Sequence, residues 1–132
     1  MRFYVASGLE NQERVRLVIE RICTRGHTMA YDWTTHGDVR CKGEEVLITI
    51  AGNETFAVID ASFVLILLPG GRGTHTELGL ALASRSNKRI VLWSETGEEF
   101  GSNEKTCAFY HHSAVERLHC GFDELLAFID AI

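Results

Sequence analysis

A glycine-rich segment that ends in an acidic residue is the part of this chain best suited to chemistry. It runs from Pro69 to Gly79 as PGGRGTHTELG and directly follows the uninterrupted apolar run Phe63–Leu68. A buried strand that leads through a glycine loop into a helix N-terminus forms an anion-binding corner, because the backbone amides there point at the ligand. Glu77 would lie one turn into that helix, with its carboxylate able to face the same ligand. The pattern indicates chemistry on a sugar or a nucleotide.

We expect the loop to bind substrate through five consecutive residues, which are Gly70, Gly71, Arg72, Gly73 and Thr74. The guanidinium of Arg72 has the fork geometry that suits a phosphate. A solvated loop charge is the alternative interpretation of the same residue.

The same stretch also fits a purely structural pattern. Thr74 followed three residues later by Glu77 is a capping box, in which Thr74 caps the helix and Glu77 reaches back to the N–H of the cap. Under this interpretation Glu77 has no catalytic role, and the corner belongs to a non-catalytic nucleotide-binding or sensing module. The glycine loop and the buried strand before it favour catalysis by Glu77.

Composition limits the class of protein. The chain has 132 residues, of which 45% are hydrophobic, and a formal net charge of −5. This length supports one domain, residues 1–132, with a core of its own. The absence of any Lys/Arg cluster argues against a nucleic-acid polymer as partner and favours a small ligand.

Targeting and metal-binding patterns are also lacking. No signal peptide precedes the first apolar strand and no apolar run approaches the length of a membrane span, so we expect a cytoplasmic protein without a membrane partner. The four cysteines form no C-x-x-C pair, and the six histidines show no metal-ligand spacing. We therefore expect neither a metal nor another cofactor.

Apolar strands and helical patterns alternate along the chain. Strands are expected over 2–6, 28–31, 63–68 and 89–93, with a possible fifth over 107–110. Helices are expected after residue 11 up to about Gly26, over 43–59, after the glycine loop, and over 122–132. Strands that are apolar on both faces and alternate with helices predict the α/β class, as a single-domain open parallel sheet in a flavodoxin- or Rossmann-like three-layer sandwich.

Such a sheet binds ligands outside the carboxyl ends of its strands, near the point where the strand order reverses. The loops after the first and third strands are therefore expected to converge. Tyr4, Ser7, Gly8 and Glu77 would then share one pocket.

The residues at these positions resemble the nucleoside 2-deoxyribosyltransferase family. Its members open with a short strand that bears a tyrosine and carry a catalytic glutamate in a Glu-Leu-Gly triplet at the start of a helix. Residues 3–7 (FYVAS) and 76–79 (TELG) match these motifs, and the resemblance spans nearly the whole chain. Separately, residues 69–77 fit the P-G-G-x-G-T-x-x-E pattern of the Lonely Guy phosphoribohydrolases, which release the base from a nucleoside 5′-monophosphate.

The resemblance implies cleavage of the N-glycosidic bond of a (deoxy)nucleoside or a nucleoside 5′-monophosphate. Glu77 would attack C1′ and form a glycosyl-enzyme, which passes the sugar to another base in a transferase or to water in an N-glycosidase. Tyr4 would orient Glu77, and Glu54 or its rival Asp60 would handle the proton of the leaving base. The family often has Asp or Ser six residues before the nucleophile; Gly71 stands there in this chain and favours a backbone cradle for the sugar.

The resemblance also implies a homo-oligomer, a dimer or larger, because family members complete their sites with residues from a neighbour. The apolar C-terminal segment 125–129 fits an interface and fits a core helix equally well. The aromatic cluster 109–112 would pack against a neighbouring subunit or close over a base, and Trp33 could close over a base from its loop.

Overall fold

The five strands form one parallel sheet in which β1 and β3 lie side by side. The computed structural model describes all residues, 1–132. The strand order is β2-β1-β3-β4-β5, and every pairing is parallel. The strands are β1 (Arg2–Ser7), β2 (Thr28–Met29), β3 (Phe63–Leu67), β4 (Arg89–Ser94) and β5 (Val115–His119). The order reverses between β1 and β3, as the sequence predicts.

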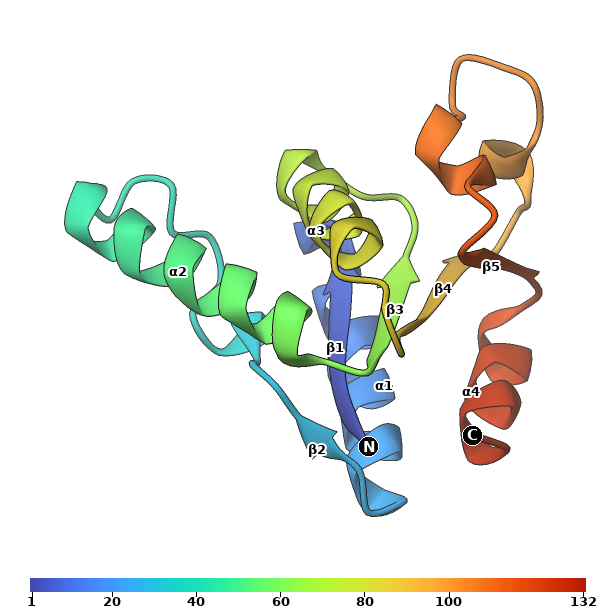
Figure 1. Ribbon diagram of the computed structural model, residues 1–132, viewed down its shortest axis with the longest axis horizontal. Coiled ribbons are helices and arrows are strands. Elements are labelled where there is room, and N and C mark those ends of the chain that lie inside the picture. Colours follow the sequence, from blue (N-terminus) through green and yellow to red (C-terminus); the bar gives the residue numbers. More distant parts are fainter.

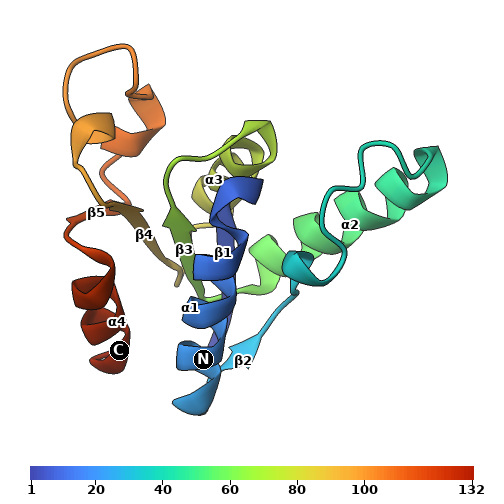
Figure 2. The same ribbon diagram turned by 180° about the vertical axis from the view of Figure 1, so that it is seen from behind.

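Four α-helices cover the two faces of the sheet (Figure 1). On one face α1 (Gln12–Thr24) packs beside α4 (Phe122–Asp130), and on the other α2 (Glu44–Asp60) packs beside α3 (Arg72–Ala83). Figure 2 shows the face that α1 and α4 cover. Helix–sheet–helix layering confirms the predicted three-layer α/β fold.

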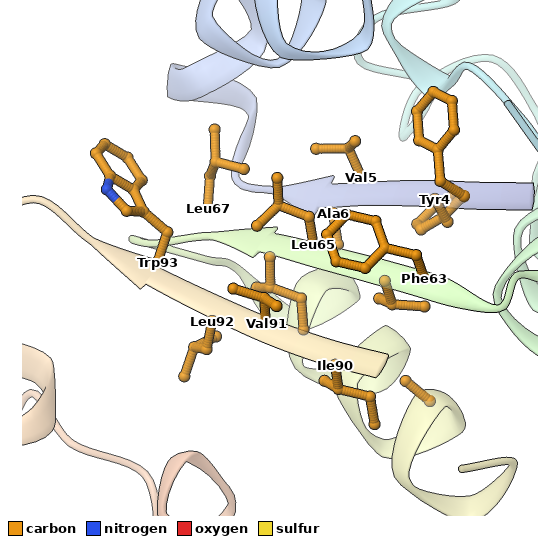
Figure 3. Packing of buried hydrophobic residues seen from close by; sticks show 14 of the residues in the cluster. Tyr4, Val5, Ala6, Phe63, Leu65, Leu67, Ile90, Val91, Leu92 and Trp93 are labelled. Atoms are coloured by element: carbon orange, nitrogen blue, oxygen red, sulfur yellow. The ribbon is translucent and has the colours of Figure 1, made fainter. Parts of the chain in front are cut away.

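The central strands are buried on both faces, and for this reason they appear in the sequence as continuous apolar runs. All five residues of β3 are buried, as are five of the six residues of β4. Figure 3 shows the side chains of β1, β3 and β4 packed together, with Trp93 at the carboxyl end of β4. The indole N–H of Trp93 donates a hydrogen bond to the Cys120 carbonyl at 2.9 Å, so the polar atom of this buried ring is satisfied.

The prediction of a fifth strand over 107–110 is wrong. That segment lies around a short 3-10 helix, η4 (Ala108–His111), and the fifth strand is β5. β5 is an edge strand in which Glu116 and Arg117 are exposed, so it carries no apolar run. The pair of hydrogen bonds from Arg89 to Glu116, at 2.9 and 3.0 Å, joins this edge to β4.

The C-terminal segment 125–129 belongs to the core. Leu125 and Ile129 of α4 are fully buried against the sheet and α1, so its apolar spacing reflects core packing. None of the helices combines the length and the apolar character that crossing a membrane would require.

Candidate active site

The carboxyl ends of β1 and β3 meet, as expected, and hydrogen bonds hold them together. The amide of Gly8 donates to the Pro69 carbonyl at 3.3 Å. The Ser7 hydroxyl donates to the Leu67 carbonyl at 2.7 Å, and the side-chain amide of Asn11 donates to the Ser7 oxygen at 3.0 Å. The single O–H of Ser7 is thus engaged within the protein, and Ser7 shapes the floor of the site.

The glycine loop is closed by Thr74. A Cβ atom on Gly70 would lie 2.5 Å from Cγ2 of Thr74, so a larger residue there would displace the loop. The amide of Gly71 donates to the Thr74 hydroxyl at 3.1 Å. Because α3 begins at Arg72 with Gly71 as its N-cap, Thr74 is the third helical residue and does not cap the helix. The capping-box interpretation of Thr74 and Glu77 is therefore wrong.

The start of α3 offers positive charge and free donors to a ligand. The backbone N–H groups in the first turn of a helix have no partner within the helix. Arg72, the first residue of α3, is exposed, and its guanidinium makes neither an ion pair nor a hydrogen bond. Gly73 faces Glu77, since a Cβ atom on it would lie 3.9 Å from Oε1 of that carboxyl. The loop can thus present an anion-binding surface beside an acidic group.

Glu77 and Tyr4 form a buried polar pair. Tyr4 is fully buried and Glu77 is only 9% exposed, yet neither the Tyr4 hydroxyl nor Oε2 of Glu77 has a hydrogen-bond partner. A buried polar atom without a partner destabilises a fold by roughly 1–3 kcal/mol. Two such atoms together, where α3 packs on β1, are typical of a site that a substrate completes.

The environment of Glu77 opposes ionisation. Burial, together with the negative charge of Glu54, raises the pKa of the Glu77 carboxyl from 4.5 to about 8, and the nearby Tyr4 hydroxyl offsets part of this rise. Burial and the charge of Glu77 raise the pKa of the Tyr4 phenol far above its ordinary value. Tyr4 therefore stays protonated and can act only as a hydrogen-bond donor toward a carboxylate.

The structure brings Glu54 to Glu77 and leaves Asp60 at the other end of the sheet. Both residues lie on α2, but Asp60 is exposed and forms an ion pair with Arg2 at the start of β1. Glu54 is half-buried, and burial raises its pKa while His36 lowers it. Of the two rival acids, only Glu54 lies where it can act with Glu77.

Two further residues near Glu54 were missed in the sequence. The rings of Tyr31 and His36 lie 5.8 Å apart, and Nε2 of His36 is buried without a partner. Nδ1 of His36 lies 3.1 Å from the Gly37 carbonyl, so Nε2 is the free ring nitrogen. A single histidine in a polar loop has no motif, and the only available signal was the position of this loop between the second strand and the second helix.

Trp33 does not close over the site. It is buried, and its indole N–H donates to the Val5 carbonyl at 2.8 Å, so it belongs to the core.

A histidine–tyrosine pair ties η4 to the glycine loop. Nε2 of His75 lies 2.6 Å from the Tyr110 hydroxyl, and the two rings stack with centroids 5.7 Å apart. Nδ1 of His75 lies 2.6 Å from the Gly71 carbonyl. Within the aromatic cluster 109–112, Tyr110 is thus buried beside the loop, whereas Phe109 is exposed.

The fold is an open parallel α/β sheet, and the candidate site lies beside the point where its strand order reverses, which is where sheets of this kind bind ligands. No family model and no curated protein matches the sequence. The chain is similar in structure to a CMP N-glycosidase from Clostridium botulinum, BcmB, at 17% identity over 98% of this chain and 99% of that one, with a TM-score of 0.68.

Two further solved structures share the fold. BlsM aligns at 21% identity over 98% of this chain and 87% of that chain, with a TM-score of 0.72. A conserved protein from Enterococcus faecalis V583 aligns at 17% identity over 99% of this chain and 98% of that chain, with a TM-score of 0.63. These likenesses show a common fold.

Proposed function

We propose that the protein cleaves the N-glycosidic bond of a nucleoside or a nucleoside 5′-monophosphate, with Glu77 as the nucleophile. The proposal rests on one observation: a buried Glu77 on α3 faces Tyr4 of β1 and lies near the half-buried Glu54 of α2. The structural neighbour BcmB is a CMP N-glycosidase, and this likeness supports a nucleotide substrate. The resemblance to the nucleoside 2-deoxyribosyltransferases supports the same reaction class.

The two carboxyl groups would divide the work between them. A Glu77 carboxylate attacks C1′ as the bond to the base breaks, and Glu54 gives its proton to the departing base nitrogen. The sugar then has the character of an oxocarbenium ion, which the negative charge of Glu77 stabilises. In the second step Glu54 takes a proton from water, or from the acceptor base, as the new bond to C1′ replaces the ester to Glu77.

Proton sharing follows from the electrostatics of the pair. Glu54 and Glu77 repel each other when both are ionised, so near neutral pH they hold one proton between them. The reactive form carries that proton on Glu54. The hydroxyl of Tyr4 favours this form because it stabilises a negative charge on Glu77.

The glycine loop favours a 5′-phosphate on the substrate. Arg72 and the free amides at the start of α3 are suited to a phosphate, and the match of residues 69–77 to the Lonely Guy pattern points the same way. Gly71, where the resembled family often has an acidic or hydroxyl side chain, leaves room for a backbone cradle.

The test is chromatographic detection of free base from a panel of nucleosides and their 5′-monophosphates, with and without a second base. Release without an acceptor indicates a hydrolase, and release only with an acceptor indicates a transferase. We expect Glu77→Ala and Glu54→Gln to lose activity and Asp60→Asn, on the same helix but away from the site, to retain it. If no substrate releases base, or if Glu77→Gln keeps the wild-type rate, the proposal fails and a non-catalytic nucleotide-binding module becomes the better description.

A further inference from the structure

Two stacked rings hold the first peptide unit of α3 in one orientation. Nδ1 of His75 lies 2.6 Å from the carbonyl oxygen of Gly71, which also accepts the first hydrogen bond of the helix from the backbone N–H of His75 at 3.1 Å. On the other side of the ring, Nε2 of His75 lies 2.6 Å from the Tyr110 hydroxyl. The contacts therefore form an unbroken chain from η4 to the glycine loop.

The partners of His75 determine where its protons lie. A carbonyl oxygen only accepts hydrogen bonds, so Nδ1 carries the proton of the neutral ring and Nε2 accepts one. Tyr110 donates it, because burial raises the pKa of its phenol to about 12 and keeps the hydroxyl protonated. The Tyr110 side chain is 4% exposed, and this hydrogen bond satisfies its polar atom. Donation thus runs in one direction, from Tyr110 through His75 to Gly71.

The orientation of the Gly71 carbonyl sets the orientation of the Arg72 amide, because both belong to one peptide unit. In a trans peptide the C=O and the N–H point in opposite directions. A carbonyl held toward His75 therefore directs the N–H of Arg72 away from the helix, where it has no helical partner and is free for a ligand. Glycine restricts its own peptide little, so the contact with His75 supplies a restraint that the loop itself lacks.

The segment around η4 is suited to anchor the loop, because it is bonded to the sheet. The amide of Tyr110 donates to the Cys107 carbonyl at 3.0 Å, and the amide of Val115, where β5 begins, donates to the His112 carbonyl at 2.9 Å. β5 in turn pairs with β4. In Figure 1 this segment, drawn in orange, lies beyond the carboxyl end of β4.

We propose that His75 and Tyr110 are positioning residues, which hold the amide of Arg72 toward the phosphate of the substrate. The inference rests on the proposed function, because it takes a nucleoside 5′-monophosphate as the substrate and the glycine loop as its phosphate site. Neither ring acts on the glycosidic bond. Loss of either one should therefore weaken binding of phosphate-bearing ligands and leave the chemistry at Glu77 in place.

The test is a titration with inorganic phosphate followed by the backbone amide resonance of Arg72, since this measurement needs no turnover. We expect wild type to bind, and Tyr110→Phe and His75→Ala to bind about two- to tenfold more weakly, as for loss of one hydrogen bond. The matched control is His27→Ala, because His27 is also half-buried but precedes β2 at the opposite edge of the sheet. Circular dichroism of each variant verifies that it is folded.

His75→Asn separates positioning from packing. The side-chain nitrogen of asparagine occupies the place of Nδ1 and can donate to the Gly71 carbonyl, whereas no ring remains to stack on Tyr110. We expect His75→Asn to bind phosphate more tightly than His75→Ala, although both lose the ring. Equal affinities in the two variants would mean that His75 acts only through packing, which overturns the proposal.

Steady-state assays extend the test to the reaction. Tyr110→Phe and His75→Ala should raise KM for 5′-monophosphates, with kcat little changed and KM for nucleosides as in wild type. If no substrate releases base, the proposed function fails, while the phosphate titration still decides whether the two rings position the loop. An Arg72 amide that does not respond to phosphate in wild type, or wild-type phosphate affinity in both Tyr110→Phe and His75→Ala, overturns the inference.

Discussion

Replacing Glu77 with glutamine is expected to stabilise the folded protein near neutral pH while it removes the nucleophile. The pKa of this carboxyl is 4.5 in its ordinary state and about 8 in the folded protein. Below pH 4.5 both the folded and the unfolded chain keep the proton, so the group has no destabilising effect there. As the pH rises toward 8 the unfolded chain ionises at Glu77 while the folded chain does not, and the free energy of unfolding falls.

The size of the effect follows from the pH interval. Each pH unit between the two pKa values lowers the free energy of unfolding by about 1.4 kcal/mol. From 4.5 to 7 this amounts to about 3 kcal/mol, and the loss stops once the folded carboxyl also ionises near pH 8. Glutamine has nearly the same shape and no charge, so Glu77→Gln should regain about 3 kcal/mol at pH 7 and nothing at pH 4.5.

Urea unfolding monitored by tryptophan fluorescence measures this difference, because Trp33 and Trp93 are both buried and report loss of the core. The control is Glu20→Gln, which neutralises an exposed glutamate on α1 and should change stability little at either pH. If the difference between Glu77→Gln and wild type is the same at pH 4.5 and pH 7, burial does not raise the pKa of Glu77 and the reasoning is refuted.

Three further predictions concern activity. Tyr4→Phe removes the hydroxyl that favours ionised Glu77, so steady-state assays should show kcat/KM lower by about 100-fold; an unchanged rate would exclude Tyr4 from the reaction. In the wild type, kcat/KM should fall above about pH 8, where the carboxyl pair loses its last proton. Because the Tyr4 hydroxyl lowers the pKa of Glu77, this fall in kcat/KM should occur at a higher pH in Tyr4→Phe. Gly70→Ala should displace Thr74 and raise KM for 5′-monophosphates more than for nucleosides, and equal effects on both would argue against phosphate binding by the loop.

The central elements could be predicted from the sequence because burial on both faces leaves a clear pattern. The apolar runs 63–68 and 89–93 correspond to β3 and β4 nearly residue for residue. The edge strand β5 could not be predicted, because one side faces solvent and its charged residues pair across the sheet surface. Residues 107–110 are more apolar than β5, but they are apolar because this segment packs Tyr110 beside His75 and not because it forms a strand.

For the candidate site, the expectation that Glu77 and Tyr4 come together drew on the local motif, on the rule for ligand sites in open parallel sheets and on the family resemblance, since residue spacing alone does not show it. The choice between Glu54 and Asp60 was beyond the sequence, because six residues along a helix span about 9 Å and only tertiary packing decides which end of α2 meets the site. The position of His36 near Glu54 could not be predicted from the sequence either, since an isolated histidine in a polar loop belongs to no recognisable motif. The catalytic roles of these residues remain predictions.

The candidate site has a rigid floor, formed by the elements that carry Tyr4 and Glu77, and a loosely packed wall, formed by residues 36–54. This difference determines which parts of the site can change in sequence without loss of stability. Tyr4 and Glu77 rest on elements locked together by the bonds between Ser7, Asn11 and the end of β3. In the segment 36–54, by contrast, no residue is fully buried. Substitutions there have little effect on stability. The proposed reaction needs Glu54, the last residue of this wall, but the other wall residues can change and alter the substrate range while Tyr4, Glu77 and Glu54 are kept.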